Sequence, residues 1–187
     1  MKSDMVDKVV SKIKTNPIVR WFVKIDQVIS NTLEYHVRYS HKLASLFVIY
    51  KQLVDIIGFP IAGVALFFLA PKGPLLVGAW LFMTLINELI LKRLFKRSRP
   101  FMVDGDWSET SHLFGYSFPS NHAYVAGFFV TVWLTLHLPY LKLVLVIFTL
   151  LPISRVVLNY HFVSDVTVGF IIGILWAQTV LRWLGLG

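Results

Sequence analysis

The sequence predicts an all-α membrane protein: a polytopic bundle of about five to six transmembrane helices, preceded by an amphipathic segment at the N-terminus. Of the 187 residues, 56% are hydrophobic and 15% are charged, whereas an ordinary soluble domain has about 25% charged residues. The mean hydropathy is +0.68, and several apolar stretches approach the roughly 20 residues that a helix needs to cross a bilayer. These observations exclude a small soluble enzyme.

Cysteine content and charge narrow the class further. The chain has no cysteine, which excludes a disulfide scaffold and a cysteine-ligated metal centre. Its formal net charge is +8, which indicates contact with anionic lipid headgroups or an anionic substrate rather than with nucleic acid. We therefore expect membrane lipids among its partners, and no nucleic acid.

The N-terminal stretch, residues 1–42, is dense in charge, and its apolar residues recur at near-helical spacing with an interruption at Asn16-Pro17. This pattern favours one or two amphipathic helices lying on the membrane surface, with a solvated tail as the alternative. We expect two parts of the chain: an interfacial segment, residues 1–43, and a transmembrane domain, residues 44–187.

Five apolar segments follow and are predicted to span the membrane, within residues 50–70, 75–94, 119–138, 140–153 (extending toward 160) and 166–184. The first is the least regular, because it contains Lys51, Asp55 and Pro60. The sequence Pro-Lys-Gly-Pro at residues 71–74 predicts a tight turn. Only residues 96–118 form a long connection.

Three polar clusters are predicted to meet. Consecutive spans alternate in direction, so the long connection, the start of the third span, the end of the fourth and the start of the fifth lie on one side of the membrane. The clusters fall there, at residues 92–100, 118–122 and 154–165. We expect them to form one site, although they are remote in sequence.

The first cluster contains Lys92 and Arg99, which share a helix face if the helix continues to near Ser98, where Pro100 should end it. Glu88, one turn earlier, could pair with Lys92. The two cations could bind one anion. Alternatively, they only extend to the membrane surface, as Lys and Arg do at the ends of spans.

The second cluster predicts the start of a helix. The Ser120 hydroxyl can cap free backbone N–H groups, and the helix N-terminus can then bind a phosphate group. His122 would project from the first turn beside a seated anion. The alternative is an ordinary histidine at the membrane interface.

In the third cluster, Arg155 lies about fifteen residues into an apolar segment, so we expect an anionic group to meet it. His161 and Asp165 are spaced i,i+4, which makes them neighbours on a helix. The carboxylate could then hold one imidazole nitrogen protonated and leave the other free as a nucleophile or base. The alternative is a purely structural His–Asp pair.

Together the clusters supply three cations, a helix N-terminus and two histidines, a set suited to phosphoryl transfer through a phosphohistidine. Hydrolysis by two metal ions usually draws on several carboxylates. Asp104, Asp106 and Glu109 have no evident partner arrangement. We therefore expect no metal site.

These clusters resemble the motifs of the type 2 phosphatidic acid phosphatase superfamily, which also contains the vanadium haloperoxidases. The resemblance covers roughly residues 58–169, in the order and at the spacing of that family. The matching residues are Lys92, Arg99-Pro100, Pro119-Ser120-Asn121-His122, Ser154-Arg155, His161 and Asp165.

The resemblance implies a role for each position, no metal and no organic cofactor, and action on lipid mono- or diphosphates at the membrane surface. The implied binders of the phosphoryl oxygens are Lys92, Arg99, Arg155 and Ser120, the last with nearby backbone N–H groups. The implied catalytic residues are His122 as the acid that protonates the leaving group, His161 as the nucleophile that becomes phosphorylated, and Asp165 as the residue that orients it.

Two departures from the family pattern are Asn121 and Asn159, which stand at positions that are commonly Gly. Asn tolerates a left-handed backbone best after Gly, so we expect both turns to be kept. Five spans also put the N-terminus and the active face on one side rich in Lys and Arg, which the positive-inside tendency assigns to the cytoplasm. The resemblance implies the opposite, and we expect a multi-pass protein of the cell membrane with its active site on the extracytoplasmic face.

The expected function is an integral membrane lipid phosphate phosphatase that hydrolyses a phosphomonoester or diphosphate of a lipid. One alternative is a polyprenyl (undecaprenyl or dolichyl) diphosphate phosphatase, and another is a transferase that passes the phosphoryl group to a second acceptor. The third alternative is a non-catalytic lipid-binding relative, although this chain keeps all seven expected site residues.

Overall fold

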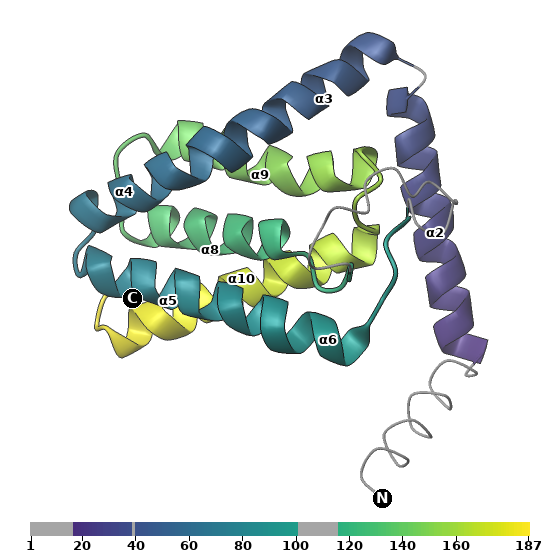
Figure 1. The fold of residues 1–187 in the computed structure, drawn as a ribbon. Helices are drawn as coiled ribbons and strands as arrows, with labels where there is room; N and C mark the ends of the chain where they lie inside the picture. Colours follow the sequence, from purple (N-terminus) through teal and green to yellow (C-terminus); the bar gives the residue numbers. More distant parts are fainter. Residues whose placement is uncertain (1–16, 39, 101–115) are drawn as a thin grey trace, which may run out of the picture.

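The computed structural model describes residues 17–38, 40–100 and 116–187. Within these ranges all regular structure is helical, which confirms the all-α prediction. Figure 1 shows helices packed side by side into a bundle, with α2 running across one end of it. The elements are α2 (Pro17–Arg38), α3 (His41–Leu53), η1 (Val54–Gly58), α4 (Phe59–Leu69), α5 (Gly73–Ile86), η2 (Asn87–Leu91), α6 (Lys92–Phe95), α8 (Asn121–Thr135), α9 (Leu141–Val157) and α10 (Val163–Trp183).

Two of the long helices contain a π turn of five residues each. The run α3–η1–α4 is one continuous helix, and so is α5–η2–α6. The first π turn ends two residues before Pro60, and the N–H of Phe59 donates to the carbonyl of Val54 instead of following the α-helical pattern. Such turns occur frequently at functional sites. Asp55 lies in the first and Glu88 in the second, so each π turn carries an acidic residue.

Three of the described helices are long and apolar enough to cross a bilayer, judged by length and composition: Lys42–Leu69, Gly73–Phe95 and Val163–Trp183. Helices α8 and α9 have 15 and 17 residues. At 1.5 Å per residue they reach about 22 Å and 25 Å, which is short of the roughly 30 Å of hydrocarbon. The count of five spans therefore stays a prediction.

Helix α8 forms the centre of the bundle. Its side chains are buried almost continuously from Ala123 to Trp133, as expected for a helix that is apolar on all sides. Phe129 stacks on Phe148 of α9 at a centroid distance of 4.9 Å and meets Trp80 of α5 edge-on at 5.0 Å. The predicted third span is thus surrounded by its neighbours.

Small residues bring the backbones of α8 and α10 into direct contact. A Cβ at Gly173 would overlap the carbonyl oxygen of Tyr124, and one at Gly127 would overlap that of Phe170. This use of glycine at a helix interface is typical of membrane proteins. The glycine contact fixes the start of α8 beside the start of α10.

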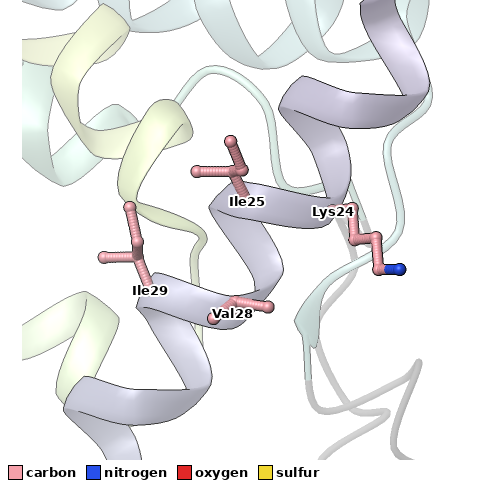
Figure 2. Close-up of a pocket in the computed structure, with 4 residues that line it drawn as sticks. All are labelled: Lys24, Ile25, Val28 and Ile29. Atoms are coloured by element: carbon pink, nitrogen blue, oxygen red, sulfur yellow. The ribbon is translucent and has the colours of Figure 1, made fainter. Parts of the chain in front are cut away.

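Helix α2 packs across the ends of α9 and α10. Its polar residues Ser30 and Glu34 are buried, whereas Val28 and Ile29 are about half exposed. A surface hollow of about 330 Å³ on α2 is lined by Lys24, Ile25, Val28 and Ile29, and Figure 2 shows Ile25 and Ile29 on the same side of the helix, with Lys24 pointing away. None of the seven expected site residues lines this hollow. The expected position of α2 on the membrane surface stays a prediction, and residues 1–16 lie outside the described part.

Several boundaries differ from those expected. The turn at residues 71–74 is confirmed, with Lys72 in a left-handed conformation (φ 55°). The helix of the first predicted span begins at His41 rather than near residue 50, because Ser40 caps it by accepting from the N–H of Leu43 (3.4 Å). The helix that was expected to end near Ser98 ends at Phe95, because Lys96 takes a left-handed conformation (φ 47°).

The glycine contact between α8 and α10 can be tested by adding one methyl group. In Gly173→Ala, the new Cβ would clash with the backbone of Tyr124, and overpacking of this kind costs about 1–3 kcal/mol. We expect the apparent Tm in detergent to fall by roughly 2–12 °C. Gly78→Ala is the matched control, because a Cβ at Gly78 has no atom within 4 Å. Equal Tm values for the two variants would contradict this account of the packing.

Candidate active site

The three motifs lie at one end of the bundle, where α6 ends, α8 begins and α9 passes into α10 (Figure 1). All seven expected site residues belong to the described part of the chain. His122 is partly exposed. The other six are buried: Lys92, Arg99, Ser120, Arg155, His161 and Asp165.

His161 lies just before α10, in contact with Asp165 and Ser117. The distance from His161 Nδ1 to Asp165 Oδ2 is 3.7 Å, and to Ser117 Oγ it is 3.3 Å. The two residues are neighbours as expected, but they do not share a helix, because α10 begins between them. Asp165 is in its first turn and accepts from the N–H of Phe162 (2.9 Å), as acidic residues commonly do at this position.

Ser117 determines which nitrogen of His161 carries the proton. Its hydroxyl donates to Asp165 Oδ2, so its oxygen remains to accept the proton of His161 Nδ1. Nε2 of the neutral imidazole then keeps its lone pair. Burial lowers the pKa of His161 to about 4, although the nearby Asp165 carboxylate raises it, and the charge of Arg99 lowers it further. The imidazole is therefore neutral at neutral pH and can act as a nucleophile.

Lys92 and Arg99 lie near each other, although they do not share a helix face. Lys92 Nζ pairs with Glu88 Oε1 at 2.5 Å, which confirms the expected pairing. Arg99 follows the end of α6, and its Nη1 donates to the carbonyl of Tyr160 at 3.5 Å, next to His161. The two positive charges are close enough to repel each other. The first motif thus meets the third.

Asp55 joins His122 to Arg155. Arg155 Nη2 donates to Asp55 Oδ1 at 2.5 Å, and His122 Nε2 lies 3.3 Å from the same oxygen. The expectation that an anionic group meets Arg155 is confirmed. In the sequence Asp55 is only an interruption of an apolar span, yet an acidic residue inside such a span is a sign of function. That sign could have identified it.

Ser120 is the N-cap residue of α8, but its hydroxyl makes no capping hydrogen bond. The expectation of a serine cap is therefore wrong. The hydroxyl is buried, and neither it nor Nε of Arg99 or Arg155 has a hydrogen-bond partner among the described residues. Buried donors normally have partners. Together with the free N–H groups in the first turn of α8, these groups can receive the oxygens of an anion.

The two departures from the family pattern behave differently. Asn159 has φ 61°, so it takes the left-handed conformation as expected. Asn121 is the first residue of α8 and has a right-handed backbone, so that expectation is wrong for it. Its side-chain oxygen accepts a hydrogen bond from Nδ2 of Asn87 at 3.2 Å. The added bulk of Asn121 is thereby held against η2.

Arg97 is a second residue that the sequence did not single out. Its guanidinium donates to Asp165 Oδ1 at 2.7 Å and to Asp26 Oδ2 of α2 at 2.6 Å. Ser117 was missed as well, although it lies directly before the second motif. The acidic residues of the long connection, Asp104, Asp106 and Glu109, lie outside the described residues. Within the described ranges, no three His, Asp or Glu side chains are grouped as metal ligands.

The site can thus bind an oxyanion, attack it with a neutral imidazole and exchange a proton through a second imidazole. The unpaired donors and the cations supply the binding. The geometry suits His161 to the part of a nucleophile, and the partly exposed His122 can reach both solvent and a leaving group.

One curated protein is similar in sequence to about half of this chain. Over 102 aligned residues the chain is 39% identical to phosphatidylglycerophosphatase B of Bacillus subtilis (strain 168). The alignment covers 49% of this chain and 47% of that protein, so the chain matches about half the length of this relative.

A solved structure is similar to this fold over nearly the whole chain. It is described as the crystal structure of the first transmembrane PAP2 type phosphatidylglycerolphosphate phosphatase from Bacillus subtilis. The TM-score is 0.66 at 26% sequence identity, covering 97% of this chain and 92% of that one. With the candidate spans, this likeness identifies the chain as a multi-pass membrane protein.

The family model agrees with the motifs. A model of the PAP2 superfamily matches residues 73–186, which is more than half of the chain and includes all three motifs. The resemblance noted from the sequence is thereby confirmed, and the chain belongs to the PAP2 superfamily.

Proposed function

We propose that the protein is an integral membrane lipid phosphate phosphatase that works through a phosphohistidine intermediate. The observation that carries the proposal is the buried His161 imidazole, with its Nδ1 side turned to Ser117 and Asp165. This imidazole lies beside cations and unpaired donors that suit a phosphoryl group.

In the first step, Nε2 of His161 attacks the phosphorus atom, and the bond between phosphorus and the lipid oxygen breaks. His122 gives a proton to that oxygen, so the lipid leaves as an alcohol. The developing positive charge on His161 is stabilised by the Asp165 carboxylate, whose Oδ2 lies 3.7 Å from Nδ1, and by Ser117, which accepts from Nδ1–H. The phosphoryl oxygens are held by Lys92, Arg99, Arg155, Ser120 and the N–H groups at the start of α8.

In the second step, a water molecule attacks the phosphorus atom of the phosphohistidine. His122, now neutral, takes a proton from this water. The phosphorus–nitrogen bond breaks, inorganic phosphate leaves and His161 returns to its neutral form. The partial exposure of His122 supports this role, because the same imidazole must meet both the lipid oxygen and water.

For the substrate, we propose phosphatidylglycerophosphate first, since both relatives carry this activity in their names. A polyprenyl diphosphate is the second candidate, because the cationic site also suits a diphosphate. A non-catalytic lipid-binding relative is disfavoured by the retention of all seven expected residues. A transferase would keep the same residues, and product analysis by mass spectrometry would distinguish it from a phosphatase.

We also propose that the active site faces the extracytoplasmic side of the cell membrane. The positive-inside tendency counts cations in loops near the ends of spans. At this end of the bundle, Lys92, Arg97 and Arg155 are paired with carboxylates inside the protein. These three residues should therefore be left out when the loop cations on each side of the membrane are counted.

A panel of lipid phosphates tests the proposal. The purified protein in detergent should release phosphate from phosphatidylglycerophosphate faster than from undecaprenyl diphosphate or phosphatidate. His161→Asn should reduce the release to the uncatalysed level and abolish the labelled phosphoenzyme, because the nucleophile is lost. His137→Asn is the matched control, since His137 is exposed at the opposite end of α8. Normal turnover by His161→Asn would reject the mechanism.

The role of His122 predicts a dependence on the leaving group. A lipid alkoxide needs a proton as it leaves, whereas p-nitrophenolate does not. His122→Asn should therefore lower kcat about 10²–10⁴-fold on the lipid substrate and much less on p-nitrophenyl phosphate. An equal loss on both compounds, measured by phosphate release, would show that His122 is not the acid.

Vanadate and a chelator distinguish the phosphohistidine route from metal-dependent hydrolysis. Vanadate mimics the five-coordinate phosphoryl group and should compete with the substrate. EDTA at millimolar concentration should leave kcat unchanged, because cations of the protein hold the phosphoryl oxygens in this mechanism. Loss of activity with EDTA and its return with added Mg²⁺ or Zn²⁺ would contradict it.

A further inference from the structure

Arg97 connects helix α2 to the carboxylate that lies against His161. One guanidinium nitrogen donates to Asp165 Oδ1 at 2.7 Å, and the other donates to Asp26 Oδ2 at 2.6 Å. A planar guanidinium that binds two carboxylates fixes the direction of both. The face of the Phe162 ring lies 4.1 Å from this guanidinium and limits its movement further.

Asp26 is in turn held by the start of α10. Its Oδ1 accepts from the N–H of Ser164 at 2.9 Å, and its Oδ2 accepts from the Ser164 hydroxyl at 2.5 Å. One turn further along α2, the hydroxyl of Ser30 accepts from the N–H of Val163 at 3.1 Å. Helix α2 therefore satisfies two N–H groups in the first turn of α10 that have no partner within that helix.

The two carboxylate oxygens of Asp165 have different hydrogen-bond partners. Oδ2 accepts from Ser117 and from the N–H of Phe162, and it faces His161. Oδ1 accepts from Arg97. Asp165 is completely buried, so its negative charge needs a nearby positive charge. Arg97 supplies that charge and fixes which oxygen faces the imidazole.

We infer that Arg97 and Asp26 are positioning residues of the active site, acting on His161 through Asp165. The inference rests on the proposed function, because it assigns His161 as the nucleophile. The catalytic unit then extends across the expected boundary at residue 43 and includes α2. Arg97 lies between the two motif residues Lys92 and Arg99 but belongs to neither motif position.

The test measures kcat, KM and the rate of phosphoenzyme formation on the lipid substrate. Arg97→Gln should lower kcat about 10–100-fold, as loss of a residue that orients a catalytic side chain commonly does. KM should stay within about twofold, because the cations that hold the phosphoryl oxygens are untouched. Arg97→Lys keeps the charge but loses the planar fork, so it should recover only part of the lost kcat.

Asp26 should affect Asp165 through Arg97, whereas its bonds to Ser164 hold α2 against the start of α10. Asp26→Asn should lower kcat less than Arg97→Gln, and the double variant should be no slower than Arg97→Gln alone. Arg93→Gln is the control for charge, because Arg93 lies one turn earlier and is exposed. Ser30→Ala is the control for docking of α2, because Ser30 binds α10 without contacting Arg97.

Three results would overturn the inference: a kcat for Arg97→Gln equal to that of Arg93→Gln, additive losses in the double variant, or equal losses for Ser30→Ala and Asp26→Asn. If the Arg97 variants do not fold, as judged by thermal unfolding, the kcat values of Asp26→Asn and Ser30→Ala still test the positioning role. A wild-type protein that is inactive on every lipid phosphate would reject the proposed function itself. An active wild type with unaffected Arg97 variants would reject only the positioning role.

Discussion

The burial of one negative charge organises the catalytic end of the molecule. Asp165 has no exposed surface, and a buried carboxylate is stable only when it is paired and hydrogen-bonded. Its partners come from separate segments: Arg97 from the stretch after α6, Ser117 from the stretch before α8, and the N–H of Phe162. Its backbone carbonyl also accepts from the N–H of Ser120 (3.0 Å). All three motifs are therefore assembled around this residue.

The same principle governs the cations of the site. Lys92 and Arg155 are each paired with a carboxylate from a π turn, Glu88 and Asp55 respectively. These pairs keep the buried cations stable while no anion is bound. Because His122 lies against the same oxygen of Asp55 as Arg155 does, a change in the charge of one of these groups is felt directly by the other two.

The sequence predicted what depends on local pattern. Apolar length identified the helices, Pro-Lys-Gly-Pro identified the turn at residues 71–74, and the isolated charge of Arg155 correctly indicated an anionic partner. The features that depend on distant contacts were missed or misjudged. Asp26 meets Ser164, 138 residues away, and no local pattern reveals such a contact. The serine cap failed for a similar reason, because the Ser120 hydroxyl is buried where the motifs meet.

The glycine contact between α8 and α10 has a consequence for protein engineering. Gly169 faces the carbonyl of Ser120, and Gly173 faces that of Tyr124, so the two backbones fit each other residue by residue. A chimera that exchanges one of these helices with a relative would combine surfaces that were not selected together. Exchanging both helices as a pair would keep this fit, provided that the neighbouring helices still supply Asp55 to Arg155 and Glu88 to Lys92.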